Sequence, residues 1–435
     1  MAGTVRRASR SCPNPLLPPD ARSVQFIPVS TPRFRSFSPA LQRFFVATTV
    51  NAIGSAALFG FVLIYFHEVR GLPLRRAGLA VGAMSFAMVA CTPFGGSVSD
   101  RFGARRTLAL GCVVSIAAGA GYAWAASFPA ALAVSILLGI GNALWYPAQS
   151  ALLSLIVDST QRPAVSAFQR ASMNLGAALG GAAGGFLVRS SSLASFRWLF
   201  ALNVATYVVF LAVLPGMPPG RVDAVATVGA AARPARFTDV LRDGFFVRLL
   251  VTDVAIALGF GFLWAFMPAY ASAIGIDKAV IGVLFMLGAA SVVATQIPTL
   301  RWMRGRHRMH SLSLMNLWFM AAFVLMTTTS HTPLAVAVII IGVAQVLGGF
   351  GEAILGAVRH PLTSDLAPPE LVGRYFGLST MVFQACIGLA TTLGGVVMDH
   401  SVDAVWFLPL GVSAAGVVAT FAIRHRIPAH IAINA

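Results

Sequence analysis

Charged residues are scarce in this chain. Asp, Glu, Lys and Arg make up 10% of its 435 residues and only 14 residues are acids, whereas hydrophobic residues make up 57%. A soluble domain carries about a quarter charged residues. The scarcity of charge excludes an ordinary soluble domain and predicts an integral membrane protein. The length accommodates about twelve spanning helices of roughly 20 residues each.

Sequence signatures of catalysis are also missing. The chain has no G-x-S-x-G, no H-E-x-x-H and no P-loop, so an enzyme or an ATP-driven pump is not expected. Its four cysteines form no C-x-x-C pair. We therefore expect no disulfide framework, no metal site and no cofactor.

Twelve long apolar runs account for most of the chain and predict an all-α membrane protein with twelve transmembrane helices. We place the spans, within a few residues, at 44–66, 77–98, 107–127, 129–153, 163–187, 197–216, 246–270, 279–300, 311–328, 333–357, 372–398 and 404–423.

The net charge of +17 follows this topology. With the amino terminus inside, the cytoplasmic segments with the adjacent span ends hold 24 of the 31 Lys and Arg residues, the outer loops with the adjacent span ends hold 6, and Arg170 falls well inside a span. This asymmetry predicts that both termini are cytoplasmic. It also explains the basic charge without nucleic acid, which we do not expect as a partner.

An internal repeat divides the chain into two halves. Residues 43–65 share six identities with 248–270, and residues 137–154 share six with 347–364. Two parallel halves predict two pseudo-symmetric six-helix bundles with a site between them. We expect a disordered basic cytoplasmic tail (1–40), an N-terminal bundle (41–216), a cytoplasmic linker (217–245), a C-terminal bundle (246–425) and a cytoplasmic C-terminal tail (426–435).

A charged turn between the second and third spans is the most specific motif. It reads G-x3-D-R-x-G-x-R-R and comprises Gly96, Asp100, Arg101, Gly103, Arg105 and Arg106. This turn resembles the loop signature of the major facilitator superfamily, whose members are secondary transporters with two six-helix halves. The resemblance covers about residues 40 to 425 and implies the major facilitator fold.

The resemblance also implies a role for this loop. In the family, the Asp latches the two halves in the outward-facing state, and that role is carried here to Asp100, Arg101, Gly103 and Arg105 or Arg106. Ordinary anchoring of arginines at the cytoplasmic face is the alternative. The matching stretch of the second half, residues 301–308, keeps the positive charge but lacks the Asp, so we expect a one-sided latch.

The fifth span is rich in glycine. Its pattern resembles the antiporter signature G-x-x-x-G-P-x-x-G-G, with glycine where that signature has proline. A seam of small residues for helix packing is an equally complete explanation. The residues concerned are Gly176, Gly180, Gly181, Gly184 and Gly185.

Polar groups at membrane depth are the candidates for substrate binding, because they are costly in hydrocarbon and usually face a bundle interior or a wet cavity. Arg170 and Asn174 lie one turn apart on the fifth span. The repeat aligns Asn142 with Glu352 and Asn174 with Gln384. Interhelical hydrogen bonds are the alternative for the amides, and snorkelling to the interface is the alternative for Arg170.

Two acids lie well inside spans and are candidates for proton coupling. Glu352 has no cation close in sequence, and burial of an isolated carboxylate favours its protonated form, so we rank it first. Asp253 is the second candidate, with a salt bridge to Arg248 as the alternative role.

Aromatic residues near these positions are weaker candidates for a hydrophobic pocket, since such residues often face lipid. They include Phe59, Tyr65, Trp145, Tyr146, Trp264 and Tyr270.

The resemblance implies a secondary active transporter in the inner or plasma membrane. We expect a monomer that exports a small apolar or amphipathic compound, a drug or a metabolite, in exchange for protons. The partners are then the substrate, protons and the lipid bilayer. An importer or facilitator of a metabolite, anionic if Arg170 binds it, is the first alternative. A receptor that binds a ligand without transport is the second.

Overall fold

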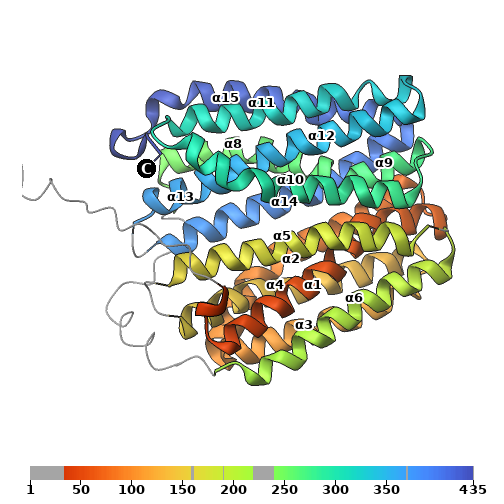
Figure 1. Cartoon of the computed structure of the whole chain (residues 1–435), viewed down its shortest axis with the longest axis horizontal. Coiled ribbons are helices and arrows are strands. Elements are labelled where there is room, and N and C mark those ends of the chain that lie inside the picture. The colour runs from red at the N-terminus through yellow and green to blue at the C-terminus, as the bar shows by residue number, and fades with distance from the viewer. Residues whose placement is uncertain (1–33, 158–160, 190, 219–239, 369–370, 435) are drawn as a thin grey trace, which may run out of the picture.

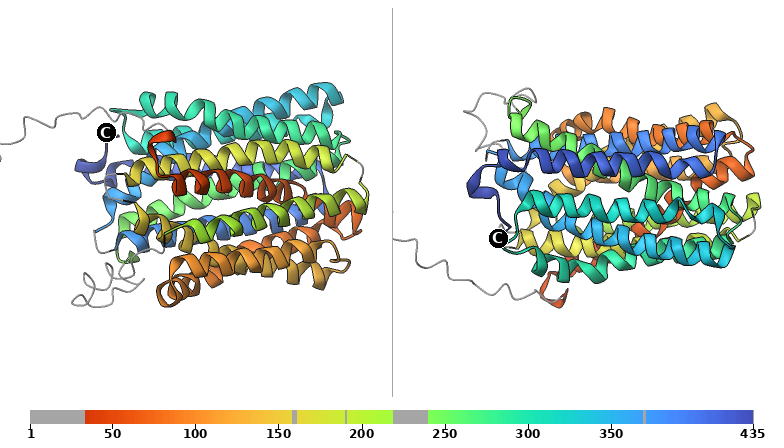
Figure 2. Two further views of the ribbon diagram at one scale, coloured as in Figure 1. Left: turned by 60° about the horizontal axis from the view of Figure 1, so that its bottom comes forward. Right: turned by 90° about the horizontal axis from the view of Figure 1, so that it is seen from above.

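The computed structural model describes residues 34–157, 161–189, 191–218, 240–368 and 371–434. Its long helices run side by side along one axis of the molecule (Figure 1). The views turned about that axis show the same alignment from the other sides (Figure 2). The expected disordered tail falls mostly on residues 1–33 and the linker mostly on 219–239, which lie outside the described residues.

The first half contains six long helices. Ser38 caps the first of these helices by accepting a hydrogen bond from the Leu41 backbone N–H. At its other end, the first helix continues into a short π-helix, η2 (Tyr65–Val69). The six helices are α1 (Pro39–Ile64), α2 (Leu74–Phe102), α3 (Ala104–Tyr122), α4 (Phe128–Ile156), α5 (Arg162–Leu187) and α6 (Leu193–Val213).

The second half repeats this order with more interruptions. Its first span consists of α8 (Gly244–Gly261), η5 (Phe262–Phe266) and α9 (Met267–Ala273), and its fourth of α12 (Leu334–Ile354), η7 (Leu355–Arg359) and α13 (His360–Leu366). Single helices form the others, namely α10 (Lys278–Met303), α11 (Arg308–Met326), α14 (Val372–His400) and α15 (Phe407–Ala422).

The predicted spans and the observed helices agree within a few residues for most spans. Within the described residues, ten helices are long and apolar enough to cross a membrane. The remaining two are α3, which begins with Arg105 and Arg106, and α5, which carries Arg170 and five glycines. The all-α membrane fold predicted from the sequence is confirmed.

Turns with left-handed backbone occur at matching places in the two halves. Gly71 precedes α2 with a φ of 67°, and Gly275 precedes α10 with a φ of 91°. Gly103 joins α2 to α3 with a φ of 84°, and Gly305 joins α10 to α11 with a φ of 70°. Glycine adopts such backbone angles without steric cost, so the repeat extends to the turns.

The two ends of the bundle carry different elements. The first and last described residues lie at one end, with α13 (left in Figure 1), which we call the terminal end. The opposite end carries α9 and the turns at Gly71 and Gly275, and we call it the distal end.

The glycines of α5 bring it close to two other helices. A Cβ on Gly176 would lie 2.4 Å from the Thr49 carbonyl oxygen, and one on Gly180 would lie 2.3 Å from that of Ile53, both on α1. A second face of α5 contacts the other half of the molecule. A Cβ on Gly185, which lies on that face, would be 2.5 Å from the Lys278 carbonyl oxygen of α10. Gly181 and Gly184 pack against Phe285 of α10 and Phe61 of α1.

We expect Gly180→Leu to destabilise the first half by about 1–3 kcal/mol, because backbone of α1 blocks the new side chain and cannot move aside cheaply. The measurement is the thermal unfolding midpoint of the detergent-purified protein. Gly96→Ala is the matched control, since a Cβ there meets nothing within 4 Å. An unchanged midpoint for Gly180→Leu would show that α1 and α5 are not packed as described.

Candidate functional site

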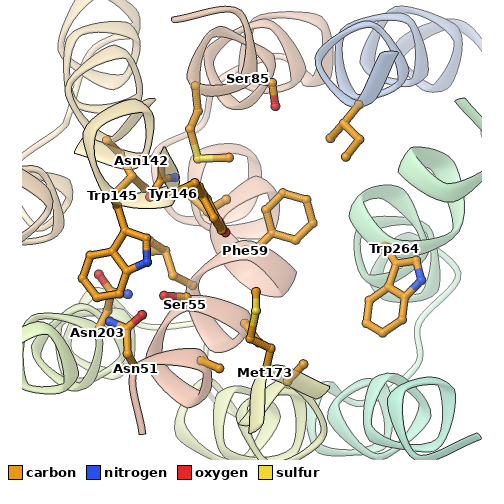
Figure 3. Close-up of a pocket in the computed structure, with 18 of the residues that line it drawn as sticks. Asn51, Ser55, Phe59, Ser85, Asn142, Trp145, Tyr146, Met173, Asn203 and Trp264 are labelled. Atoms are coloured by element: carbon orange, nitrogen blue, oxygen red, sulfur yellow. The ribbon is translucent and has the colours of Figure 1, made fainter. Parts of the chain in front are cut away.

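A cavity of about 330 Å³ lies between the two halves of the bundle. Helices α1 to α6 line it from the first half, α3 through its last residue alone, and α8, η5, α10, α12 and α14 line it from the second. Phe59 of α1 and Trp264 of η5 lie on opposite sides of this space (Figure 3). The cavity therefore lies where the internal repeat predicts a site.

Among the described residues, the wall contributed by the first half carries polar side chains within an apolar lining but no charge. It includes Asn51 and Ser55 of α1, Asn142 of α4 and Asn174 of α5, with Trp145 and Tyr146 of α4 beside them. Figure 3 shows Asn142, Trp145 and Tyr146 projecting from one helix. Such a wall offers hydrogen bonds and aromatic surface without a net charge.

The second half contributes the charge. Glu352 of α12 is the only charged residue among the described residues that line the cavity. Its Oε2 atom is buried and has no hydrogen-bond partner there. Arg170 and Trp264 are neighbours of this carboxyl group, but among the described residues Arg170 does not come within the 4 Å of a salt bridge. Glu352 therefore faces the cavity without a salt-bridge partner in the part of the chain that the structure describes.

The predicted site residues separate into two groups. Asn142, Asn174, Gln384 and Glu352 all line the cavity, and Gln384 also contacts the Met88 sulfur across the two halves at 2.9 Å. Arg170 and Asp253 are not among the lining residues.

Arg170 reaches across the interface between the halves. Its Nη1 atom lies 2.9 Å from the position of a Cβ on Gly356, which belongs to η7 and follows Glu352 by one turn. The predicted alternative of snorkelling is therefore not needed to place this cation, because a glycine in the other half makes room for it.

Asp253 forms a buried ion pair that the sequence did not indicate. Its Oδ1 atom accepts a hydrogen bond of 2.6 Å from the Arg359 Nε atom, and its Oδ2 atom pairs with Arg359 Nη2. Arg359 also donates to Thr363 and, at 3.1 Å, to Ser379.

The suggested pairing of Asp253 with Arg248 is wrong. Residues five apart on a helix point about 140° away from each other, and Arg248 is exposed whereas Asp253 is buried. Sequence reasoning missed Arg359 because its partner lies 106 residues away. An unassigned arginine near the end of the tenth span was the only available signal.

The signature loop lies at the terminal end. Asp100, Arg101 and Arg106 are exposed, whereas Arg105 donates a 3.0 Å hydrogen bond to the Met217 carbonyl, where the first half ends. Gly96 has open space around it. Among the described residues, Asp100 forms no salt bridge within 4 Å.

Contacts between the halves concentrate toward the distal end. Hydrogen bonds and ion pairs between described residues of the two halves link residues 68–88 or 191 to residues 272–278 or 384–399. Close glycine contacts add to these, since a Cβ on Gly78 would lie 2.4 Å from the Thr391 carbonyl oxygen. By contrast, most residues of α14 from 372 to 385 are partly exposed. The cavity is therefore closed toward the distal end.

Four of the six aromatic candidates line the cavity, namely Phe59, Trp145, Tyr146 and Trp264. Tyr65 and Tyr270 instead lie buried within their own halves, where their hydroxyls contact the Tyr122 carbonyl at 2.7 Å and the Thr329 hydroxyl at 2.6 Å. Sequence reasoning did not single out Asn51 and Ser55, which differ little from other polar residues of apolar helices.

Comparison with known proteins places this architecture in a family. The sequence model of the Major Facilitator Superfamily matches residues 44–346 and 255–434. Among solved structures, the D-xylose-proton symporter superposes with a TM-score of 0.70 at 16% identity, covering 89% of this chain and 97% of that one. At that identity the likeness concerns the fold.

Curated relatives match most of the chain at low identity. The uncharacterized MFS-type transporter YqjV of Bacillus subtilis (strain 168) is 24% identical over 79% of this chain and 83% of its own length. The multidrug resistance protein MdtH of Escherichia coli O1:K1 / APEC is 25% identical over 83% of this chain and 85% of its own length.

We expect Asp253→Asn to destabilise the second half by about 3–5 kcal/mol, because it leaves the buried Arg359 charge unpaired. The measurement is the unfolding midpoint and the yield of folded protein. Combining it with Arg359→Gln should recover much of the loss, since neither charge then remains. An equal or larger loss in the double variant would contradict the pairing.

Proposed function

The chain belongs to the Major Facilitator Superfamily, and from that premise we propose that it exports a small apolar or amphipathic compound in exchange for protons. Transport proceeds by alternating access, in which the two halves rock around the central cavity. We place the protein as a monomer in the inner or plasma membrane, with the terminal end in the cytoplasm. The state described above is then closed to the outside.

The composition of the cavity carries this proposal. Among the described residues that line it, aromatic and amide side chains surround one carboxyl group, Glu352. An apolar or amphipathic compound fits such walls, since stacking and a few hydrogen bonds orient it without charge complementarity. The multidrug resistance relative MdtH supports export as the direction.

Proton coupling follows from the surroundings of Glu352. A buried carboxyl group without a salt-bridge partner is stable in its neutral form and gains charge only when its environment changes. Movement of Arg170, which lies on the other half and acts on this charge, supplies such a change whenever the halves rock. Proton release and substrate movement are then linked through one conformational step.

We expect Glu352→Gln to abolish substrate accumulation driven by a proton gradient, because the side chain can no longer gain and lose a proton. Exchange of substrate down its own gradient should persist. The measurement is uptake into inside-out proteoliposomes across a panel of drugs and metabolites, with and without the gradient. The direction of the proton gradient that drives accumulation distinguishes export from import.

The control for this variant is Asp403→Asn, which makes the same acid-to-amide change at an exposed position away from the cavity. It should transport as the unmodified protein does. Full gradient-driven accumulation by Glu352→Gln would assign the proton to another group. Failure of every compound in the panel, with intact binding, would favour a receptor.

We propose a second role, for Asp100, as the latch that holds the terminal end closed in the outward-facing state. Its exposure here supports this, because a latch should be released when that end is open. Asp100→Asn should lower the transport rate about tenfold while the protein still folds and inserts, if the latch contributes about 1.4 kcal/mol. Wild-type rates in a well-expressed variant would rule the latch out.

A further inference from the structure

At the distal end, two acidic side chains each contact residues of the opposite half. Glu68 lies in η2, where the first span ends, and Asp399 lies in the last turn of α14. Each contacts the first residues of a helix in the opposite half, α10 for Glu68 and α2 for Asp399. The signature loop lies at the other end of the bundle, so these contacts are separate from it.

Glu68 is held by three partners. Its Oε2 atom pairs with the Lys278 Nζ atom at 2.8 Å and accepts a 3.0 Å hydrogen bond from Ser191. Its Oε1 atom accepts a hydrogen bond from Ser272. Lys278 also donates to the Ser191 hydroxyl at 2.7 Å, and only 12% of its side chain is exposed. This network is therefore ordered and partly shielded from water, unlike an isolated surface pair.

Asp399 completes a helix terminus that α2 cannot complete itself. Pro73 precedes α2 and provides no side-chain cap, so the first backbone N–H groups need an acceptor. Asp399 Oδ1 accepts a 3.1 Å hydrogen bond from the Leu74 backbone N–H, and its Oδ2 atom lies 3.7 Å from Arg75 Nε. The negative charge also interacts favourably with the positive end of the α2 dipole.

Close glycine contacts hold the two halves near enough for these carboxylates to contact the opposite half. Gly78 and Gly82 of α2 lie against the backbone of α14, and Gly185 of α5 lies against Gly282 of α10. Both contacts bring helices of opposite halves together within one or two turns of the carboxylates. Separation of the halves at this end would break the contacts of both carboxylates together.

We propose that Glu68 and Asp399 form a distal latch that stabilises the state in which the cavity is closed at the distal end. The inference rests on the alternating access of the proposed function. In the outward-facing state, the latch proposed at Asp100 competes with this distal latch. The relative stability of the two latches then determines the side to which the cavity opens. Removing either distal carboxylate shifts the population toward the state open at the distal end.

The test measures accessibility rather than transport. Cysteine replaces Ala177, which lines the cavity from α5, in a background without the four native cysteines. A membrane-impermeant maleimide is added from the distal side, without substrate or gradient. We expect Glu68→Gln and Asp399→Asn each to raise the labelling rate about fivefold, which corresponds to roughly 1 kcal/mol. A protein that proves not to be a proton antiporter still gives this readout.

Charge exchange decides the assignment. The double variant Glu68→Lys with Lys278→Glu should return the labelling rate close to that of the unmodified protein, which a general loss of stability cannot produce. Asp403→Asn, the matched control at the same end, should leave the rate unchanged. Unchanged labelling in both single variants, or no recovery in the exchanged pair, would overturn the latch.

Discussion

The high cost of an unpaired charge away from water governs this molecule. The chain has few acids, and the structure pairs each one that lies deep in the bundle or leaves it facing the cavity. Asp253 is buried with Arg359 as its partner, whereas Glu352 faces the cavity without a salt bridge. The first arrangement suits a fixed structural contact, and the second suits a group that changes its charge.

The fold also depends on close packing between helices, which glycine residues allow. Within lipid, helices gain little from burying apolar surface, so backbone contact over small residues does more of the work. The α5 glycines show this on two faces, because Gly176 and Gly180 meet α1 while Gly185 meets α10 of the other half. One helix therefore joins the interior of its own half to the interface with the other half.

Much of the fold could be predicted from the sequence because its signals are local or repeated. Apolar runs mark the spans, and the repeat aligns Asn142 with Glu352, which line one cavity. Contacts between distant segments could not be predicted in the same way. Arg359 lies 106 residues from Asp253, and Asp399 lies 325 residues from Leu74, so neither pairing leaves a periodic trace.

Arg170 is a further example of a contact between distant segments that the sequence does not reveal. Its position on the fifth span and its spacing from Asn174 predict which face of that helix it shares, but its neighbour is Gly356 of the other half. A helical period states which residues share a face. It does not state which helix that face meets.

The two halves share a backbone plan but divide the chemistry between them. Left-handed glycines occupy matching turns, at Gly71 and Gly275 and again at Gly103 and Gly305. Around the cavity, however, the first half offers neutral amides and aromatic rings, while the second half provides Glu352, the one charged residue among the described residues of the lining. A symmetric frame permits two related conformations of similar energy, whereas the side chains that line the cavity differ between the halves. The two halves therefore share a frame but present different chemistry to whatever enters the cavity.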